Sequence, residues 1–80
     1  MKTLNDALVD RLNKLMDERG FTQYRLAQRS GVPFPTLKSI MQRRTRGVTL
    51  KTVIMLAEGL DLTVNEFLDE SFSPENIDLE

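Results

Sequence analysis

The chain has 80 residues and a net charge of −1, which suffices for one domain with a small core. It contains no cysteine, no histidine, no glycine-rich phosphate loop and no pair of carboxylates expected in a cleft. From these absences we expect no enzyme activity, and no cofactor, metal or small-molecule site. Its apolar residues are spaced along the chain without a signal peptide or a membrane span, which predicts a cytoplasmic protein.

Residues 4–19 predict an amphipathic helix with one apolar stripe. Thr3 is the N-cap candidate, and Arg19 and Gly20 suit the C-terminal end of this helix. The residues expected to face the core are Leu4, Leu8, Leu12, Leu15 and Met16.

The stretch 23–41 predicts two short helices joined by a tight turn. The first follows the N-cap candidate Thr22, and the second runs from 34 to 41 or 42, because two prolines suit its entry. Gly31 supplies the left-handed backbone that lets the chain reverse, and the lone apolar Val32 suits the angle between the helices. This pattern is a helix-turn-helix, whose second helix can enter a DNA major groove.

Two further helices are expected after this motif. Thr49 caps the first, over 50–60, and Thr63 and Glu66 form a capping box at the start of the second, over 64–68. The residues expected in their cores are Leu50, Val53, Ile54, Ala57, Leu60, Val64, Phe67 and Leu68. Near the junction, Gly59 indicates close packing, and Asp61 stands where a left-handed turn residue is expected.

The last residues, 70–80, predict an acidic C-terminal tail that follows a domain of residues 1–69. Their apolar side chains, Phe72, Ile77 and Leu79, are isolated among acids, and Pro74 suits the start of a short terminal helix. The main interpretation is a solvated tail. The alternative is an arm that uses the three apolar residues for dimerisation or for a partner.

Positive charge is concentrated in the middle of the chain. Residues 19–57 contain no acid, and all twelve acids lie outside this range. The bases within it are Arg19, Arg25, Arg29, Lys38, Arg43, Arg44, Arg46 and Lys51. Chance variation explains such a distribution less well than an electrostatic footprint for a polyanion on one face of the protein.

These motifs resemble the Cro/C1-type, lambda-repressor-like family of helix-turn-helix proteins, also called the XRE family. The resemblance covers residues 4–68 and is carried by T-Q-x-x-L-A-x-x-x-G-V over 22–32 and L-A-x-x-L-x-L-T-V-x-E-F-L over 56–68. It implies an all-α, five-helix fold whose second and third helices form the helix-turn-helix. Most members of the family are repressors that bind palindromic operators in double-stranded DNA as dimers.

The resemblance also implies roles for individual residues. Base readout falls to the exposed positions of the third helix, which are Phe34, Pro35, Thr36, Lys38 and Ser39. Phosphate contacts fall to the start of the second helix and the loop after the third, namely Thr22, Gln23, Arg43, Arg44, Thr45 and Arg46. Leu37 and Ile40 should point inward.

The sequence departs from the family pattern at three positions. Phe34 and Pro35 stand where many members carry polar residues, and they cannot make the bidentate hydrogen bonds that identify guanine or adenine. Phe34 would contact thymine methyl groups, fold onto the core or serve a protein interface. Arg43 stands where glycine usually ends the third helix, which changes the loop after it.

Two functions follow as hypotheses. The leading one is a sequence-specific, DNA-binding transcriptional regulator, a repressor, acting as a homodimer with its third helix in the major groove. The alternative is a protein-interaction module on the same fold, such as an antitoxin or a regulator of another repressor. Phe34 and Pro35 favour the alternative, whereas the basic middle of the chain favours DNA.

Overall fold

The computed structural model describes residues 2–79, and its elements follow the order expected from the sequence. Five α-helices form the body: α1 Leu4–Arg19, α2 Gln23–Ser30, α3 Phe34–Met41, α4 Leu50–Gly59 and α5 Val64–Phe67. After them come the 3₁₀ helices η1 Glu70–Phe72 and η2 Pro74–Asn76. The strands β1 Lys2–Thr3 and β2 Ile77–Asp78 pair in parallel. The predicted five-helix fold is confirmed, with this small β pair added to it.

Threonine side chains fix the starts of four helices. In each case the hydroxyl oxygen accepts a hydrogen bond from the backbone N–H three residues later, at 3.1–3.2 Å. These four N-caps are Thr3, Thr22, Thr49 and Thr63. At α5 the carboxylate of Glu66 also accepts from the N–H of Thr63, which completes the capping box and lowers the pKa of Glu66. All four predicted caps are confirmed.

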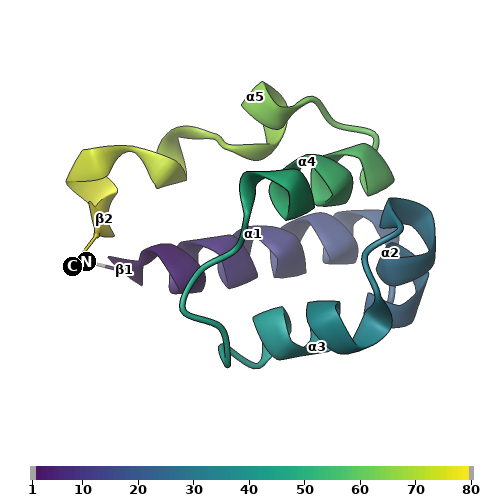
Figure 1. Ribbon diagram of the computed structural model, residues 1–80. Coiled ribbons are helices and arrows are strands. Elements are labelled where there is room, and N and C mark those ends of the chain that lie inside the picture. Colours follow the sequence, from purple (N-terminus) through teal and green to yellow (C-terminus); the bar gives the residue numbers. More distant parts are fainter. Residues whose placement is uncertain (1, 80) are drawn as a thin grey trace.

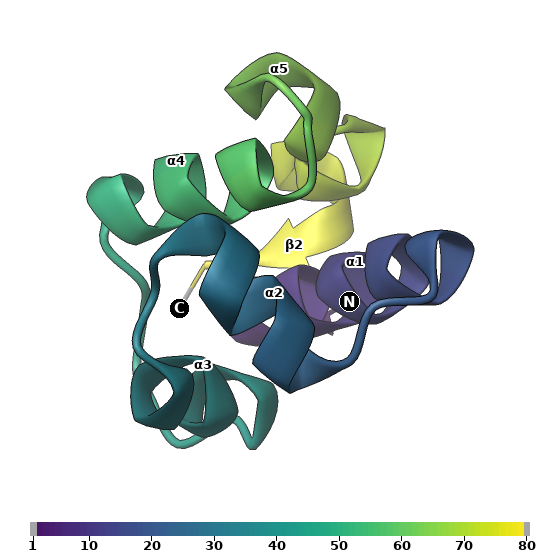
Figure 2. The ribbon, with the colours of Figure 1, turned by 90° about the vertical axis from the view of Figure 1, so that its right-hand side faces the viewer.

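The core lies where α1 passes between α3 and the pair α4 and α5 (Figure 1). Its fully buried members come from all five helices, and the largest are Leu12, Leu26, Leu37, Leu56, Leu60 and Phe67. Figure 2 shows α2 in the foreground, below α4 and above α3, and α2 packs against both helices, so that it braces the helix-turn-helix against the rest of the domain. In both views α3 forms the edge of the molecule opposite α5.

The predicted core stripe of α4 is partly wrong. Leu50 and Ile54 are exposed, while Leu56, which the stripe omitted, is fully buried. The buried face of α4 is rotated because α4 packs against α2 through Gly59. Elsewhere the prediction is wrong for Leu4 and Leu68, which are exposed at 46% and 37%.

Close packing at Gly59 is confirmed by the backbone geometry. A Cβ atom placed on Gly59 would lie 2.7 Å from Cβ of Ser30 and 2.8 Å from the Cα and backbone N of Ser30. Only a residue without a side chain permits this approach of α4 to α2. The next turn is also as expected, since Asp61 adopts the left-handed conformation with φ 59°.

The segment after α5 folds back along α1 instead of extending into solvent (Figure 1). The ring of Phe72 lies 6.4 Å from that of Phe67, and Ile77 is buried where β2 pairs with β1. The expectation of a solvated tail is therefore wrong for Phe72 and Ile77. These residues do act as apolar anchors, but they pack on their own chain. The boundary between residues 69 and 70 stays a prediction.

Candidate nucleic-acid interface

The turn between α2 and α3 has the geometry that the sequence predicts. Gly31 adopts φ 79°, and its N–H donates to the carbonyl of Ala27 at 3.0 Å, which ends α2. Val32 is 3% exposed and packs into the core with Leu37 and Ile40. The inner side of α3 is thereby fixed, and its opposite side is free to contact a ligand.

The outer side of α3 carries the residues that the sequence assigned to base readout. Phe34, Pro35, Thr36 and Lys38 are exposed, and Ser39 is half-buried. Pro35 occupies the first turn of α3, where its missing N–H leaves no intrahelical bond unmade. The structure thus brings all five residues onto one exposed helix.

Phe34 does not fold onto the core. It is 37% exposed, and its ring meets that of Tyr24 edge to face, with centroids 5.7 Å apart and planes at 72°. Tyr24, in the first turn of α2, is 60% exposed. Tyr24 was not among the residues to which the sequence assigned a role. The sequence feature that could have identified this pair is one aromatic residue in the first turn of each helix of the helix-turn-helix.

The start of α2 presents Thr22 and Gln23 beside this pair. The hydroxyl of Thr22 accepts from the N–H of Arg25 at 3.1 Å and retains its own hydrogen for donation. Gln23 is the first residue of α2 and is half-buried. The first N–H groups of a helix have no intrahelical acceptor and favour an anion.

The loop after α3 is tied to α1. The amide of Asn5 donates to the carbonyl of Thr45 at 2.6 Å. Arg43 has φ 59°, so an arginine adopts the left-handed conformation that glycine adopts at lower cost. Its guanidinium lies 2.8 Å from the carboxylate of Asp6 and 3.8 Å from that of Asp10. Arg43 therefore differs from the neighbouring arginines, with which the sequence grouped it.

Internal contacts also engage two other cations of the basic stretch 19–57. The Nε of Arg19 donates to the carbonyl of Leu60 at 3.0 Å, at the C-terminal end of α4. Arg29 donates from Nε to the carbonyl of Gly59 at 2.9 Å and pairs with the carboxylate of Asp61 at 2.8 Å. The carboxylate partner of Arg29 thus lies in the turn after α4.

Five cations of the basic stretch remain available to a ligand. They are exposed, and none of them forms an ion pair within 4.0 Å of another residue in the described range 2–79. These ligand-facing bases are Arg25, Lys38, Arg44, Arg46 and Lys51. They come from α2, α3, the loop after α3 and the start of α4.

The ion pair between Asp6 and Arg43 predicts a pH dependence of stability. Hydrogen bonds from Arg43 and then Thr3 lower the pKa of Asp6 below its ordinary value of 3.8. A carboxylate with a depressed folded-state pKa stabilises the fold above its unfolded pKa, and this contribution is lost as pH falls through the folded pKa. The melting temperature of Asp6→Asn should be below that of the wild type at pH 7, and the difference should shrink as pH falls below 3.8 through the lowered folded-state pKa of Asp6.

The matched control for this experiment is Asp17→Asn, since Asp17 is exposed on the same helix and forms no ion pair with another described residue. Thermal melts followed by circular dichroism from pH 2 to pH 7 give the comparison. If the melting temperatures of Asp6→Asn and the wild type differ by the same amount across this pH range, the assigned ion pair is contradicted.

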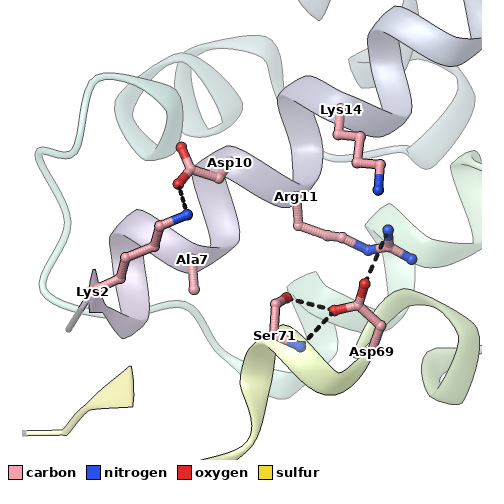
Figure 3. Close-up of a pocket in the computed structure, with 7 residues that line it drawn as sticks. All are labelled: Lys2, Ala7, Asp10, Arg11, Lys14, Asp69 and Ser71. Atoms are coloured by element: carbon pink, nitrogen blue, oxygen red, sulfur yellow. Dashed lines mark hydrogen bonds and ion pairs between the residues drawn. The ribbon is translucent and has the colours of Figure 1, made fainter. Parts of the chain in front are cut away.

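A hollow of about 180 Å³ between α1 and the segment after α5 is a second place where cations gather (Figure 3). Lys2 pairs with Asp10 at 2.6 Å, and Arg11 lies 3.3 Å from Asp69. Arg11 also donates to the carbonyls of Glu66 and Phe67 and so holds the end of α5 on α1. Lys2 and Arg11 are therefore neutralised locally. Within residues 2–79, no group of three or more His, Cys, Asp or Glu side chains is placed to hold a metal ion.

Comparison with known proteins identifies the family. The family model described as the Cro/C1-type HTH DNA-binding domain matches residues 11–71, which include α2, α3 and the loop after α3. The chain belongs to this family. The resemblance deduced from the motifs is confirmed: residues 11–71 form a Cro/C1-type DNA-binding domain.

The fold of this Cro/C1-type domain recurs in a solved structure described as the SinR protein/SinI protein complex. The two chains superpose with a TM-score of 0.69 at 25% identity, over 89% of this chain and 67% of the other. A search of curated proteins gives no match. No helix in the described part of the Cro/C1-type domain is long and apolar enough to cross a bilayer.

Proposed function

We propose that this Cro/C1-type domain is a transcriptional repressor that places α3 in the major groove of an operator. The observation that carries the proposal is the set of five exposed ligand-facing bases, which come from α2, α3, the loop after α3 and the start of α4. Phosphate contacts from Thr22, Gln23, Arg44 and Arg46 would fix the register of the domain on the duplex. The backbone carbonyl of Thr45 accepts a hydrogen bond from the amide of Asn5, and its hydroxyl would face the same DNA strand as Arg44 and Arg46.

Direct readout in this proposal is sparse. Lys38 reaches guanine acceptors or a phosphate, and Thr36 and Ser39 each offer one hydrogen bond. Phe34 and Pro35 offer apolar contact alone. Sequence-dependent shape and flexibility of the DNA would supply further discrimination.

Selection of bound sequences from a random pool of duplexes tests this function. We expect the protein to bind any duplex at low salt and to enrich a common sequence motif at higher salt. Lys38→Ala should relax the preference at one position of that motif and leave the others unchanged. Undetectable binding of random duplex at low salt would overturn the proposal.

A homodimer on a palindromic operator completes the proposal, because one small domain covers too little DNA for tight specificity. The support is an apolar hollow of about 330 Å³ between α1, α4 and the end of α5. Three exposed leucines line it, namely Leu4, Leu50 and Leu68. A second copy docked there would leave α3 of each copy free.

Leu50→Glu tests the dimer. Leu50 is 65% exposed, so the substitution should leave the fold intact while placing a charge in the dimer contact. We expect sedimentation to show a monomer, and binding to the selected operator to weaken at least tenfold more than binding to random duplex. Leu79→Glu, at a leucine that is 70% exposed and lies outside this hollow, is the control. A Leu50→Glu protein that still sediments as a dimer contradicts this contact.

The second candidate function is a protein-interaction module. It is favoured by the exposed pair of Tyr24 and Phe34, and the similar solved structure is itself a complex of two proteins. The five ligand-facing bases of the helix-turn-helix and the elements next to it argue for DNA over an apolar partner alone. The random-duplex assay separates the two functions.

A further inference from the structure

The contact between Tyr24 and Phe34 leaves two aromatic rings in solvent at the start of the DNA-facing helices. The other three phenylalanines belong to the core or pack against it: Phe67 is buried, and Phe21 and Phe72 are partly buried. Tyr24 and Phe34, by contrast, remain 60% and 37% exposed while touching each other edge to face. The contact therefore holds the ring of Phe34 in place without burying it.

The surroundings of this pair are positively charged. Lys38 lies one turn after Phe34 on the same face of α3, and Arg25 follows Tyr24 on α2. No acidic residue occurs between Arg19 and Ala57. An apolar surface flanked by cations matches the DNA major groove, in which pyrimidine methyl groups lie between two rows of phosphates.

We propose that Phe34, positioned by Tyr24, recognises the C5-methyl group of a pyrimidine in the major groove. A phenyl ring has no hydrogen-bond donor or acceptor, so it distinguishes bases by their apolar groups. Thymine and 5-methylcytosine carry the same methyl group at C5, whereas cytosine and uracil lack it. The contact thus follows the methyl group and not the base pair. This inference rests on the proposed DNA-binding function.

Base analogues in the selected operator provide the test, because deoxyuridine differs from thymidine only by the absence of this methyl group. Each thymine is replaced singly, and the affinity of the full-length protein is measured by fluorescence anisotropy. At one or two positions we expect a loss of about fourfold, the effect of exposing one buried methyl group. At the same position, 5-methylcytosine should bind about fourfold more tightly than cytosine.

Variants then assign the methyl contact to residues. Phe34→Ala should abolish the difference between thymine and uracil, and Phe34→Leu should keep part of it. Tyr24→Ala should reduce the difference because the ring of Phe34 loses its support, whereas Tyr24→Phe should retain it. The matched control is Arg44→Ala, which should weaken binding to the thymine and uracil sites equally. Both aromatic residues are exposed, so circular dichroism should show every variant folded.

Several results would overturn this inference. Equal affinity of the wild type for thymine and uracil sites at every position removes the methyl contact but leaves the DNA-binding function standing. A thymine preference that survives in Phe34→Ala assigns the contact to another residue. Unchanged affinity of Phe34→Ala for all duplexes indicates that the aromatic pair serves a protein partner. Failure of the wild type to bind any duplex removes the proposed function together with the inference.

Discussion

Replacing Gly59 with alanine should lower the free energy of unfolding by about 2 kcal/mol and the melting temperature by roughly 10 °C. The added Cβ would meet Ser30 at 2.7–2.8 Å, and two of the three atoms it meets belong to the backbone of α2. No side-chain rotation relieves such a contact, so α2 and α4 must separate. Overpacking costs about 3 kcal/mol, and the higher helix propensity of alanine recovers only about 1 kcal/mol.

The control for Gly59 is Gly47→Ala. Gly47 has no heavy atom within 4 Å of an added Cβ and no positive φ, so its substitution should change stability by less than about 0.5 kcal/mol. Urea and thermal unfolding followed by circular dichroism measure both variants. A Gly59→Ala protein as stable as the wild type would show that α2 and α4 adjust to a side chain between them.

Removing Arg44 and Arg46 together should weaken binding to every duplex by roughly 60-fold at 0.1 M salt. With each of the five ligand-facing bases neutralising one phosphate, the slope of log K against log salt is about −4.5, and the double alanine variant should reduce it to about −2.7. The loss should be equal on operator and random DNA, because phosphate contacts carry no sequence information. Fluorescence anisotropy at several salt concentrations measures both quantities.

Two further variants sharpen this test. Lys14→Ala removes an exposed cation of α1 outside the basic stretch and should leave the slope unchanged. Arg43→Ala should reduce the slope less than Arg44→Ala, because Asp6 already neutralises Arg43. A slope that falls equally for Arg43→Ala and Arg44→Ala would show that DNA displaces the ion pair with Asp6.

The local features of the fold were predictable because their causes lie within a few residues. A threonine hydroxyl caps a helix by binding the N–H three residues later, so Thr3, Thr22, Thr49 and Thr63 were found from spacing alone. Gly31 was found in the same way, since a helix end followed by a reversal requires a left-handed residue. These predictions needed no knowledge of which helices meet.

The long-range features were not predictable from periodicity. Leu50 was expected in the core and is exposed, whereas Leu56 was left out of the expected core and is buried. The packing of α4 on α2 sets the rotation of α4 and so decides which of its residues are buried. Ile77 reads as an isolated apolar residue until β2 is seen beside β1. For the candidate interface, counting charges identified the basic stretch but could not separate Arg43 from Arg44, because the carboxylate of Asp6 is 37 residues away in the sequence.

The pairing of β1 with β2 has a consequence for the order of folding. It joins Lys2 to Ile77, so almost the whole chain must be closed into a loop before this contact contributes any stability. The contacts of α2 with α3 and of α4 with α5 close much shorter loops of the chain. The pairing therefore belongs after the transition state, where it slows unfolding while leaving the folding rate almost unchanged. We therefore expect loss of the β1–β2 pairing to raise the rate of unfolding more than it lowers the rate of folding.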